Sequence, residues 1–253
     1  MHALIRSLGC LAVLALVSGL ARAQDDANAV VARAIKAHGG EAKLTKFKAT
    51  KMKAKGTIDL MGNSVEYTME AVSQHPDQMR NEIKMDLMGN AVTIVMVLNK
   101  KEGWRSINAA GMAQTMDLEG AELEDAREDA YGDYLESLVP LLKDKEIKLE
   151  ALGESKVEGK PAVGIKISNK GHKDFKMFFD KESGLLVKSQ RRGKDPAMNE
   201  VDVENFVSNY KDVDGVKIPM KLLVKHDGKK FLDGDISEVK LLESVDEKTF
   251  AKP

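Results

Sequence analysis

The segment from Asn63 to Asn90, NSVEYTMEAVSQHPDQMRNEIKMDLMGN, decides the fold of this chain. Apolar and polar residues alternate in both of its halves, which is the period of a β-strand with one buried and one solvated face. The sequence therefore predicts strands whose apolar sides face a core. Their inward positions are Val65, Tyr67, Met69, Ala71, Ile83, Met85 and Leu87.

A pentapeptide, Asp-Leu-Met-Gly-Asn, occurs at residues 59–63 and again at residues 86–90. Each copy lies between two alternating runs and contains a glycine followed by asparagine, at Gly62 and Gly89. Glycine supplies the positive φ that tight hairpin turns require. Because the similarity is confined to the turns, it indicates two successive hairpins of a β-meander rather than a solenoid repeat.

Two regions have helical periodicity instead. Apolar residues recur at helical spacing over residues 25–38, Gly39-Gly40 favours a helix end, and a short turn is expected over residues 41–46. Residues 118–142 carry a second apolar stripe, which Pro140 is expected to stop or bend. The opposite side is acidic, and we interpret it as a solvated face because it lacks the spacing of a calcium loop. Its residues are Glu122, Glu124, Asp125, Glu128, Asp129 and Asp133.

A second meander follows this helical insertion near residues 118–142, so the expected order is helix, strands, helical insertion and strands. A large single sheet buries its apolar face only by closing, by folding over or by being capped with helices. We therefore predict a mainly β fold with α-helices, in which a curved antiparallel sheet forms a half-open β-barrel. It should contain about 10–11 strands, with the helices packed in its concave face. The seam between sheet and helices is where an apolar ligand would enter.

Residues 1–23 have the features of a cleaved secretory signal peptide. Arg6 lies in a short first segment, residues 8–20 are mostly apolar, and Ala21-Arg22-Ala23 is a suitable cleavage site before Gln24. The apolar run is too short to span a bilayer comfortably, so a retained anchor is the less favoured alternative. We expect the protein to be exported to the periplasm without a permanent membrane anchor.

The mature chain, residues 24–253, is expected to form a single domain and a monomer. Its net charge is −3, because the signal peptide removes Arg6 and Arg22 from a chain of net charge −1. A chain with a small negative net charge lacks the excess of basic residues that is typical of nucleic-acid-binding proteins. The only cysteine, Cys10, lies in the signal peptide, so no disulfide can form. Acylation at Cys10 is the alternative, but almost no apolar segment precedes it.

The mature sequence carries no catalytic or metal-binding signature. Its histidines, His38, His75, His172 and His226, are widely spaced, which disfavours a zinc site. There is also no G-x-S-x-G or H-E-x-x-H motif and no cysteine nucleophile. We therefore predict that the protein is not an enzyme and uses neither a metal nor another cofactor.

Several local motifs together suggest a known fold. They are His38-Gly39-Gly40-Glu41, His75-Pro76-Asp77-Gln78-Met79-Arg80, Gly103-Trp104, Phe179 to Leu186, Tyr210 to Pro219, and Val245 to Pro253. With the order of elements, they resemble the periplasmic lipoprotein-carrier superfamily, the LolA/LolB-like proteins related to outer-membrane lipoprotein sorting. The resemblance covers most of residues 24–253. It implies an incomplete barrel, lidded by helices, whose hydrophobic cavity takes acyl chains or other lipids.

One position departs from that family. The lipoprotein carriers have an arginine immediately before the strand-start proline, and it ties the lid helices to the barrel. Here the position is His75, which can donate similar hydrogen bonds but is mostly neutral at neutral pH, so the resemblance implies a modified latch. Arg80 alternates onto the polar side with Glu82 and Lys84, and we predict a solvated cross-strand charge for it.

Methionines concentrate in the first meander, between Met52 and Met116. Flexible thioethers suit a cavity that adapts to an acyl chain, but they also fill ordinary cores. A copper site is less favoured, because the paired methionines lack nearby histidine or cysteine. Trp104 is expected to be a core or rim anchor whose indole N–H needs a partner. The predicted cavity-lining residues are Tyr67, Met69, Met79, Ile83, Met85 and Trp104.

The sequence thus favours a non-enzymatic periplasmic carrier or binder of a lipid, lipoprotein or other hydrophobic ligand. The alternative is an interaction or sensor module of the cell envelope, with the same fold and no bound ligand. An enzyme with novel site chemistry is a third hypothesis. The expected partners are a hydrophobic small molecule or acyl chain, or an envelope protein.

Signal-peptide cleavage is directly testable. N-terminal sequencing of the exported protein should begin at Gln24, because cleavage is expected after Ala23. A mature chain that retains its first residues, or one acylated at Cys10, would contradict this model.

Overall fold

The computed structural model describes residues 26–60 and 62–253. The predicted signal peptide, residues 1–23 with Cys10, lies outside the described residues. None of the helices in the described part of the chain has the length and apolarity needed to cross a membrane.

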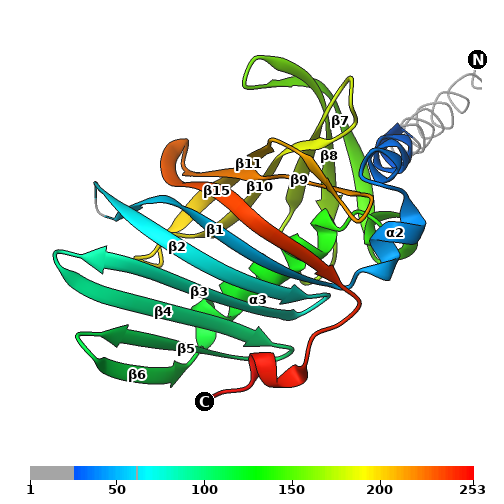
Figure 1. Ribbon diagram of the computed structural model, residues 1–253. Coiled ribbons are helices and arrows are strands. Elements are labelled where there is room, and N and C mark those ends of the chain that lie inside the picture. The colour runs from blue at the N-terminus through cyan, green and yellow to red at the C-terminus, as the bar shows by residue number, and fades with distance from the viewer. Residues whose placement is uncertain (1–25, 61) are drawn as a thin grey trace, which may run out of the picture.

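One curved antiparallel sheet of 13 strands dominates the molecule and does not close into a barrel (Figure 1). Its strand order is β6-β5-β4-β3-β2-β1-β15-β14-β11-β10-β9-β8-β7, so β6 and β7 are its edges. The predicted fold class is confirmed. The strands are β1 (Ala49–Leu60), β2 (Asn63–Gln74), β3 (Gln78–Leu87), β4 (Asn90–Asn99), β5 (Glu102–Ala109), β6 (Met112–Asp117), β7 (Lys148–Val157), β8 (Lys160–Ser168), β9 (Phe175–Asp180), β10 (Leu186–Lys194), β11 (Glu200–Ser208), β14 (Lys221–His226) and β15 (Lys229–Leu242).

The sheet has more strands than the 10–11 expected, and the excess lies after the helical insertion. Over residues 216–226 the chain makes two strands instead of one long strand. Pro219 separates them, because proline has no N–H to donate to a ladder. The first piece, β13 (Val216–Ile218), pairs with β12 (Lys211–Val213) in a separate two-stranded ribbon, and β14 joins the main sheet.

The repeated pentapeptide forms the same turn twice. The Asp59 carboxylate accepts a hydrogen bond of 2.8 Å from the Gly62 N–H, and Asp86 accepts one of 2.6 Å from Gly89. The two glycines have φ values of 84° and 85°. Both turns therefore have the positive φ that the sequence predicted, and they join β1 to β2 and β3 to β4.

Helices cover the concave face, as predicted (Figure 1). They comprise residues 26–37, α2 (Glu41–Lys46), α3 (Gly120–Glu136) and α4 (Pro140–Lys143). The first helix buries Ala27, Val31 and Ala34 completely, in one core with Met177 and Phe179 of β9. The helix is interrupted between the end of α3 at Glu136 and the start of α4 at Pro140, which confirms the expected interruption.

The opposite face of the sheet is covered by the C-terminal segment. There η1 (Glu247–Phe250) packs over β3 and β4. Val97, Trp104 and Phe250 form a small buried core, and the Trp104 indole N–H donates to the Phe250 carbonyl at 3.3 Å. Leu98, the next residue on β4, instead packs against α3. Trp104 is therefore a core anchor on the face away from the helices.

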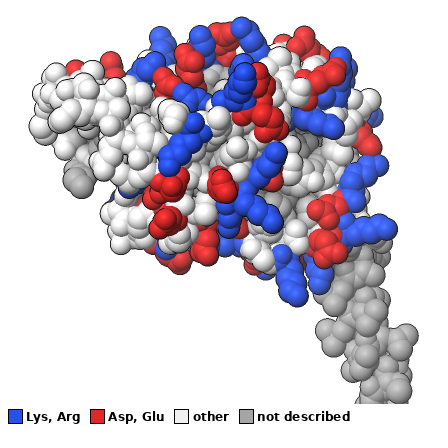
Figure 2. Space-filling model, turned by 90° about the horizontal axis from the view of Figure 1, so that it is seen from below, with Lys and Arg blue, Asp and Glu red and all other residues white. Residues whose placement is uncertain are grey.

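Charged residues of both signs are interspersed over most of the surface, but one lobe is nearly free of them (Figure 2). This lobe lies at the hairpin ends of β3–β4 and β5–β6, where residues 87–99 and 106–116 contain no charged side chain. Met88 and Met112 lie at these ends and are 99% and 76% exposed.

The first helix is tied to the small ribbon through His38 and Gly39. The His38 carbonyl accepts a hydrogen bond of 3.0 Å from the Lys217 N–H. Gly39 has a φ of 125°, and a Cβ atom at this position would lie 2.3 Å from the Gly215 carbonyl oxygen. The helix can approach the ribbon this closely only because residue 39 has no side chain.

We expect Gly39→Ala to lower the free energy of unfolding by at least about 2 kcal/mol more than Gly40→Ala does. Both glycines have positive φ, so both substitutions introduce backbone strain, but a Cβ at Gly40 meets no atom within 4 Å. Urea unfolding measures the stability of both variants, and the difference between them reports the steric clash of the new side chain at residue 39 with the ribbon. Equal losses in both variants would contradict this close contact.

Candidate functional site

A cavity of about 240 Å³ lies between the concave face of the sheet and the elements that cover it. Its wall includes residues from α2, α3, β1, β2, β10, β11, β13 and β15. Most of this wall is apolar, which suits a hydrophobic ligand. The apolar lining residues are Leu44, Phe47, Leu138, Leu186, Val207, Val216, Ile218, Pro219 and Leu241.

A second cavity, of about 150 Å³, lies further along α3. Met79 and Phe175 contribute to its wall, together with Arg191 of β10. Asp133 and Glu136 line both cavities, so the last turn of α3 forms the wall between them. The larger cavity thus has an acidic end.

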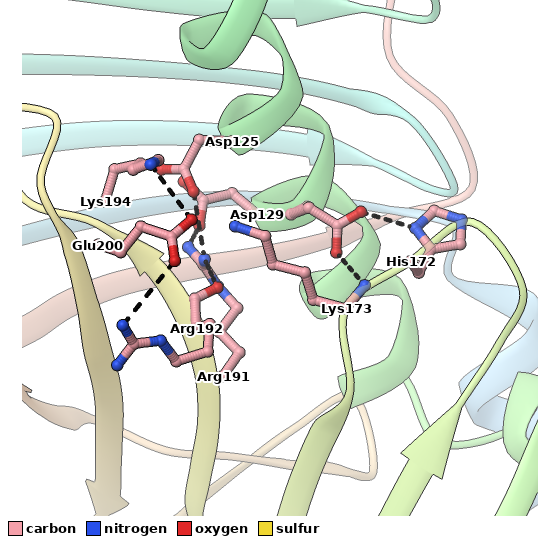
Figure 3. Close-up of polar contacts among 9 residues, drawn as sticks. Asp125, Asp129, His172, Lys173, Arg191, Arg192, Lys194 and Glu200 are labelled. Atoms are coloured by element: carbon pink, nitrogen blue, oxygen red, sulfur yellow. Dashed lines mark hydrogen bonds and ion pairs between the residues drawn. The ribbon is translucent and has the colours of Figure 1, made fainter.

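The acidic side of α3 is not simply the solvated face that the sequence suggested. Asp125 and Asp129 both form ion pairs with Arg191, and the first of these distances is 3.5 Å (Figure 3). Glu128 accepts a hydrogen bond of 2.9 Å from the His172 Nδ1 and one of 3.0 Å from the Lys173 N–H. A helix laid in a concave sheet has neighbours on most sides, so these acids pair with the sheet and its loops.

Burial changes the ionisation of the two carboxyls at the cavity wall. Burial, with repulsion from Glu136, raises the pKa of Asp133 to about 7. Burial also raises the pKa of Glu136, although a hydrogen bond from Ser189 opposes this. The Asp133 side chain is exposed to the cavity, and the protein atoms packed around the cavity wall raise its pKa. The pair therefore takes up a proton more readily than ordinary surface acids do.

Two histidines in the cavity wall are kept neutral by burial. The His38 Nδ1–H donates to the Ala34 carbonyl at 2.8 Å, and its Nε2 accepts from the Leu186 N–H at 3.4 Å. Burial lowers the pKa of His38 and lowers that of His75 to about 4. Both rings are therefore neutral imidazoles at neutral pH.

His75 lies in the turn between β2 and β3 and faces α3. Its ring centroid is 6.2 Å from that of Tyr134. In the described part of the chain the ring makes no hydrogen bond or ion pair to the helix, so its contact there is by packing. Arg80 lies elsewhere and pairs at 2.6 Å with Glu82 of the same strand, β3, so its partner lies along the strand and not across it as expected.

The structure distributes the predicted site residues over four places. His75 lines the larger cavity and Met79 lines the smaller one. The prediction that Trp104 lines the cavity was wrong, because strand alternation turns it to the opposite face of the sheet, where it packs under Phe250. The remaining four, which share an apolar cluster with Leu232 near the hairpin ends, are Tyr67, Met69, Ile83 and Met85.

Sequence reasoning missed Asp133 and Glu136 as cavity residues. The available signal was the spacing of Asp125, Asp129 and Asp133, which places three acids in one stripe along a helix. That stripe needed a buried partner, and Arg191 at an inward position of β10 supplies it. Within residues 26–60 and 62–253, no three histidine, cysteine or acidic side chains come together as metal ligands.

No protein-family model matches the sequence, and no curated protein matches it by sequence. Solved structures do resemble the fold. A DUF1329 family protein from Desulfovibrio piger has a TM-score of 0.57 and 14% identity, over 89% of this chain and 97% of that one. A LolA superfamily protein from Nitrosomonas europaea has a TM-score of 0.53 and 10% identity, over the same shares of the two chains. The chain therefore has a LolA-like fold, an open curved sheet with helices in its concavity.

The depressed pKa of His75 predicts a pH-dependent stability. Between pH 6.5 and about 4 the unfolded chain binds a proton at His75 that the folded chain does not. The free energy of unfolding therefore decreases as the pH is lowered through this range. Replacing His75 with glutamine should remove up to about 3 kcal/mol of this loss. Urea unfolding at several pH values measures it, and the opposite contribution of Asp133 cancels in the difference. Parallel curves for the two proteins would refute the assignment.

Proposed function

We propose that this protein is a non-enzymatic periplasmic carrier or binder of a hydrophobic ligand. The observation that supports this most directly is the apolar cavity between the curved sheet and its covering elements. Burying an apolar ligand in such a cavity removes its surface from water, at about 25 cal/mol per Å². The periplasmic location rests on the expected signal peptide at residues 1–23.

The cover over the cavity contains an element that is suited to move. The ribbon β12–β13 contributes Val216 and Ile218 to the cavity wall and belongs to a separate sheet of only two strands. Isolated two-stranded ribbons are marginally stable in water, so this one depends on its contacts with neighbours. One of these is the hydrogen bond from Lys217 to His38 at the end of the first helix. Ligand entry would separate the ribbon from the underlying strands.

His75 is suited to act as the latch between the barrel and α3. It lies against Tyr134 through ring packing alone, and its ring is neutral. A charge-assisted hydrogen bond is roughly twice as strong as a neutral one, so a packed neutral histidine holds a lid less firmly than an arginine would. Ligand release in this protein would accordingly need little disruption at this position.

The methionine-containing cluster at the hairpin ends would extend the apolar surface of the site. Tyr67 and Met85 are buried there, while Met69 and Ile83 are only partly buried. Thioether and aliphatic side chains adapt to a flexible chain at small cost. The role of these residues toward a ligand is part of this proposal, and the cavity beside His75 is its primary site.

A cavity-filling substitution tests the proposal. Ser73 of β2 lines the cavity, and Ser73→Phe places an aromatic ring in the space that a ligand would occupy. We expect at least tenfold weaker binding of the uncharged fluorophore N-phenylnaphthylamine, measured by fluorescence titration, since steric exclusion removes about 1.4 kcal/mol or more.

The matched control is Thr68→Phe, an exposed position that alternates onto the other face of the same strand. It should bind the fluorophore as the wild type does. Saturable binding that Ser73→Phe leaves unchanged would place the ligand outside this cavity. No saturable binding by the wild type would favour the alternative, an envelope interaction module that uses the same fold without a ligand.

A further inference from the structure

The wall between the two cavities presents an acidic pair to the larger one. Asp133 and Glu136 lie one helical turn apart on α3 and line both cavities. In the described part of the chain, the Asp133 carboxylate has no hydrogen-bond or ion-pair partner, and Glu136 receives one hydrogen bond, from Ser189. An apolar chamber thus ends in carboxylates that the protein itself does not neutralise.

The cations that line the two cavities form ion pairs with other acids. Arg191 of β10 lines the smaller cavity, but it is paired with Asp129 and Asp125, which lie about one and two turns before Asp133 on α3. Lys217 of the ribbon lines the larger cavity and pairs with Asp212 at 3.3 Å. Neither cation is paired with Asp133 or Glu136.

The remaining titratable groups in the wall are neutral. Burial lowers the pKa of His38 and of His75, so neither imidazole carries a charge at neutral pH. Burial also raises the pKa of Tyr210, whose hydroxyl donates to the Leu186 carbonyl at 2.8 Å. The electrostatic character of the cavity is therefore set by the two acids.

We infer that the cavity selects an amphiphile whose head is a protonated amine, with its chain on the apolar wall and its ammonium group between Asp133 and Glu136. This inference rests on the proposed function and deepens it. An ammonium group has three donors, and its hydrogen bonds to carboxylates are charge-assisted. Chains that end in a carboxylate meet two like charges instead, so the same pair rejects fatty acids.

The inference carries a pH signature that an uncharged ligand does not share. Asp133 loses its proton around pH 7, whereas an alkyl amine stays protonated up to about pH 10. Amine binding should therefore tighten as the pH rises from 6 to 8. None of the other charged or titratable groups in the two cavity walls would make amine binding weaker as the pH rises from 6 to 8. These groups are Glu136, Asp129, Arg191, Lys217, His38, His75 and Tyr210.

Isothermal titration calorimetry with octylamine, octanol and octanoate separates this inference from the proposed function. Octanol tests the apolar cavity alone, and the ratio of octylamine to octanol affinity tests the acidic pair. For the wild type at pH 8 we expect octylamine to bind about tenfold more tightly than octanol, and octanoate to bind most weakly.

The double variant Asp133→Asn with Glu136→Gln should reduce the ratio of octylamine to octanol affinity to near one. It removes two carboxylates that repel each other, so it should fold at least as stably as the wild type. The control Glu124→Gln neutralises an exposed acid of the same helix and should keep the wild-type ratio. Equal binding of octylamine and octanol by the wild type would overturn this inference alone, whereas failure of both to bind would overturn the proposed function as well.

Discussion

A sheet that curves without closing must cover its apolar concave face with something other than itself. Here the first helix and the α3–α4 segment supply the cover, and side chains such as Val31, Leu135 and Phe179 are fully buried where they meet. Everything else in the structure depends on that contact. It places α3 in the concavity, it brings the small ribbon against the end of the first helix, and it leaves the cavity where helices and sheet do not fill the space between them.

A helix in this position cannot keep an entire face in solvent, and that explains the charge arrangement inside the fold. Asp125 and Asp129 approach β10, and Arg191 compensates both of them. Breaking such a buried pair by removing one partner leaves an uncompensated charge, which is far costlier than losing an exposed pair. Asp133 and Glu136 form no ion pair with that arginine in the described structure, and burial raises the pKa of both carboxyls.

Local periodicity was sufficient to predict the strands, both pentapeptide turns, the helical insertion and its break before Pro140. It failed where the outcome depended on which elements become neighbours. The split at Pro219 produced a separate ribbon. Strand alternation turns Trp104 away from the cavity, and a C-terminal segment far away in sequence buries it there through Phe250. Asp133 and Glu136 were not predicted as cavity residues for the same reason. An acidic stripe on a helix is interpreted as a solvated face unless the strand that packs against it is known. The resemblance to lipoprotein carriers supplied the fold but not these neighbours.

An unclosed barrel also leaves two strands, β6 and β7, without a partner on one side, and exposed strand edges are templates for aggregation. The two edges are protected differently. β7 carries a register irregularity between Ala151 and Gly153 and is rich in lysine and glutamate, which disfavour pairing with another chain. β6 is only 6 residues long and has no lysine, so its protection is its shortness. The uncharged lobe adjoins this second edge, which makes β6 the position where lengthening or flattening a strand would most readily promote self-association.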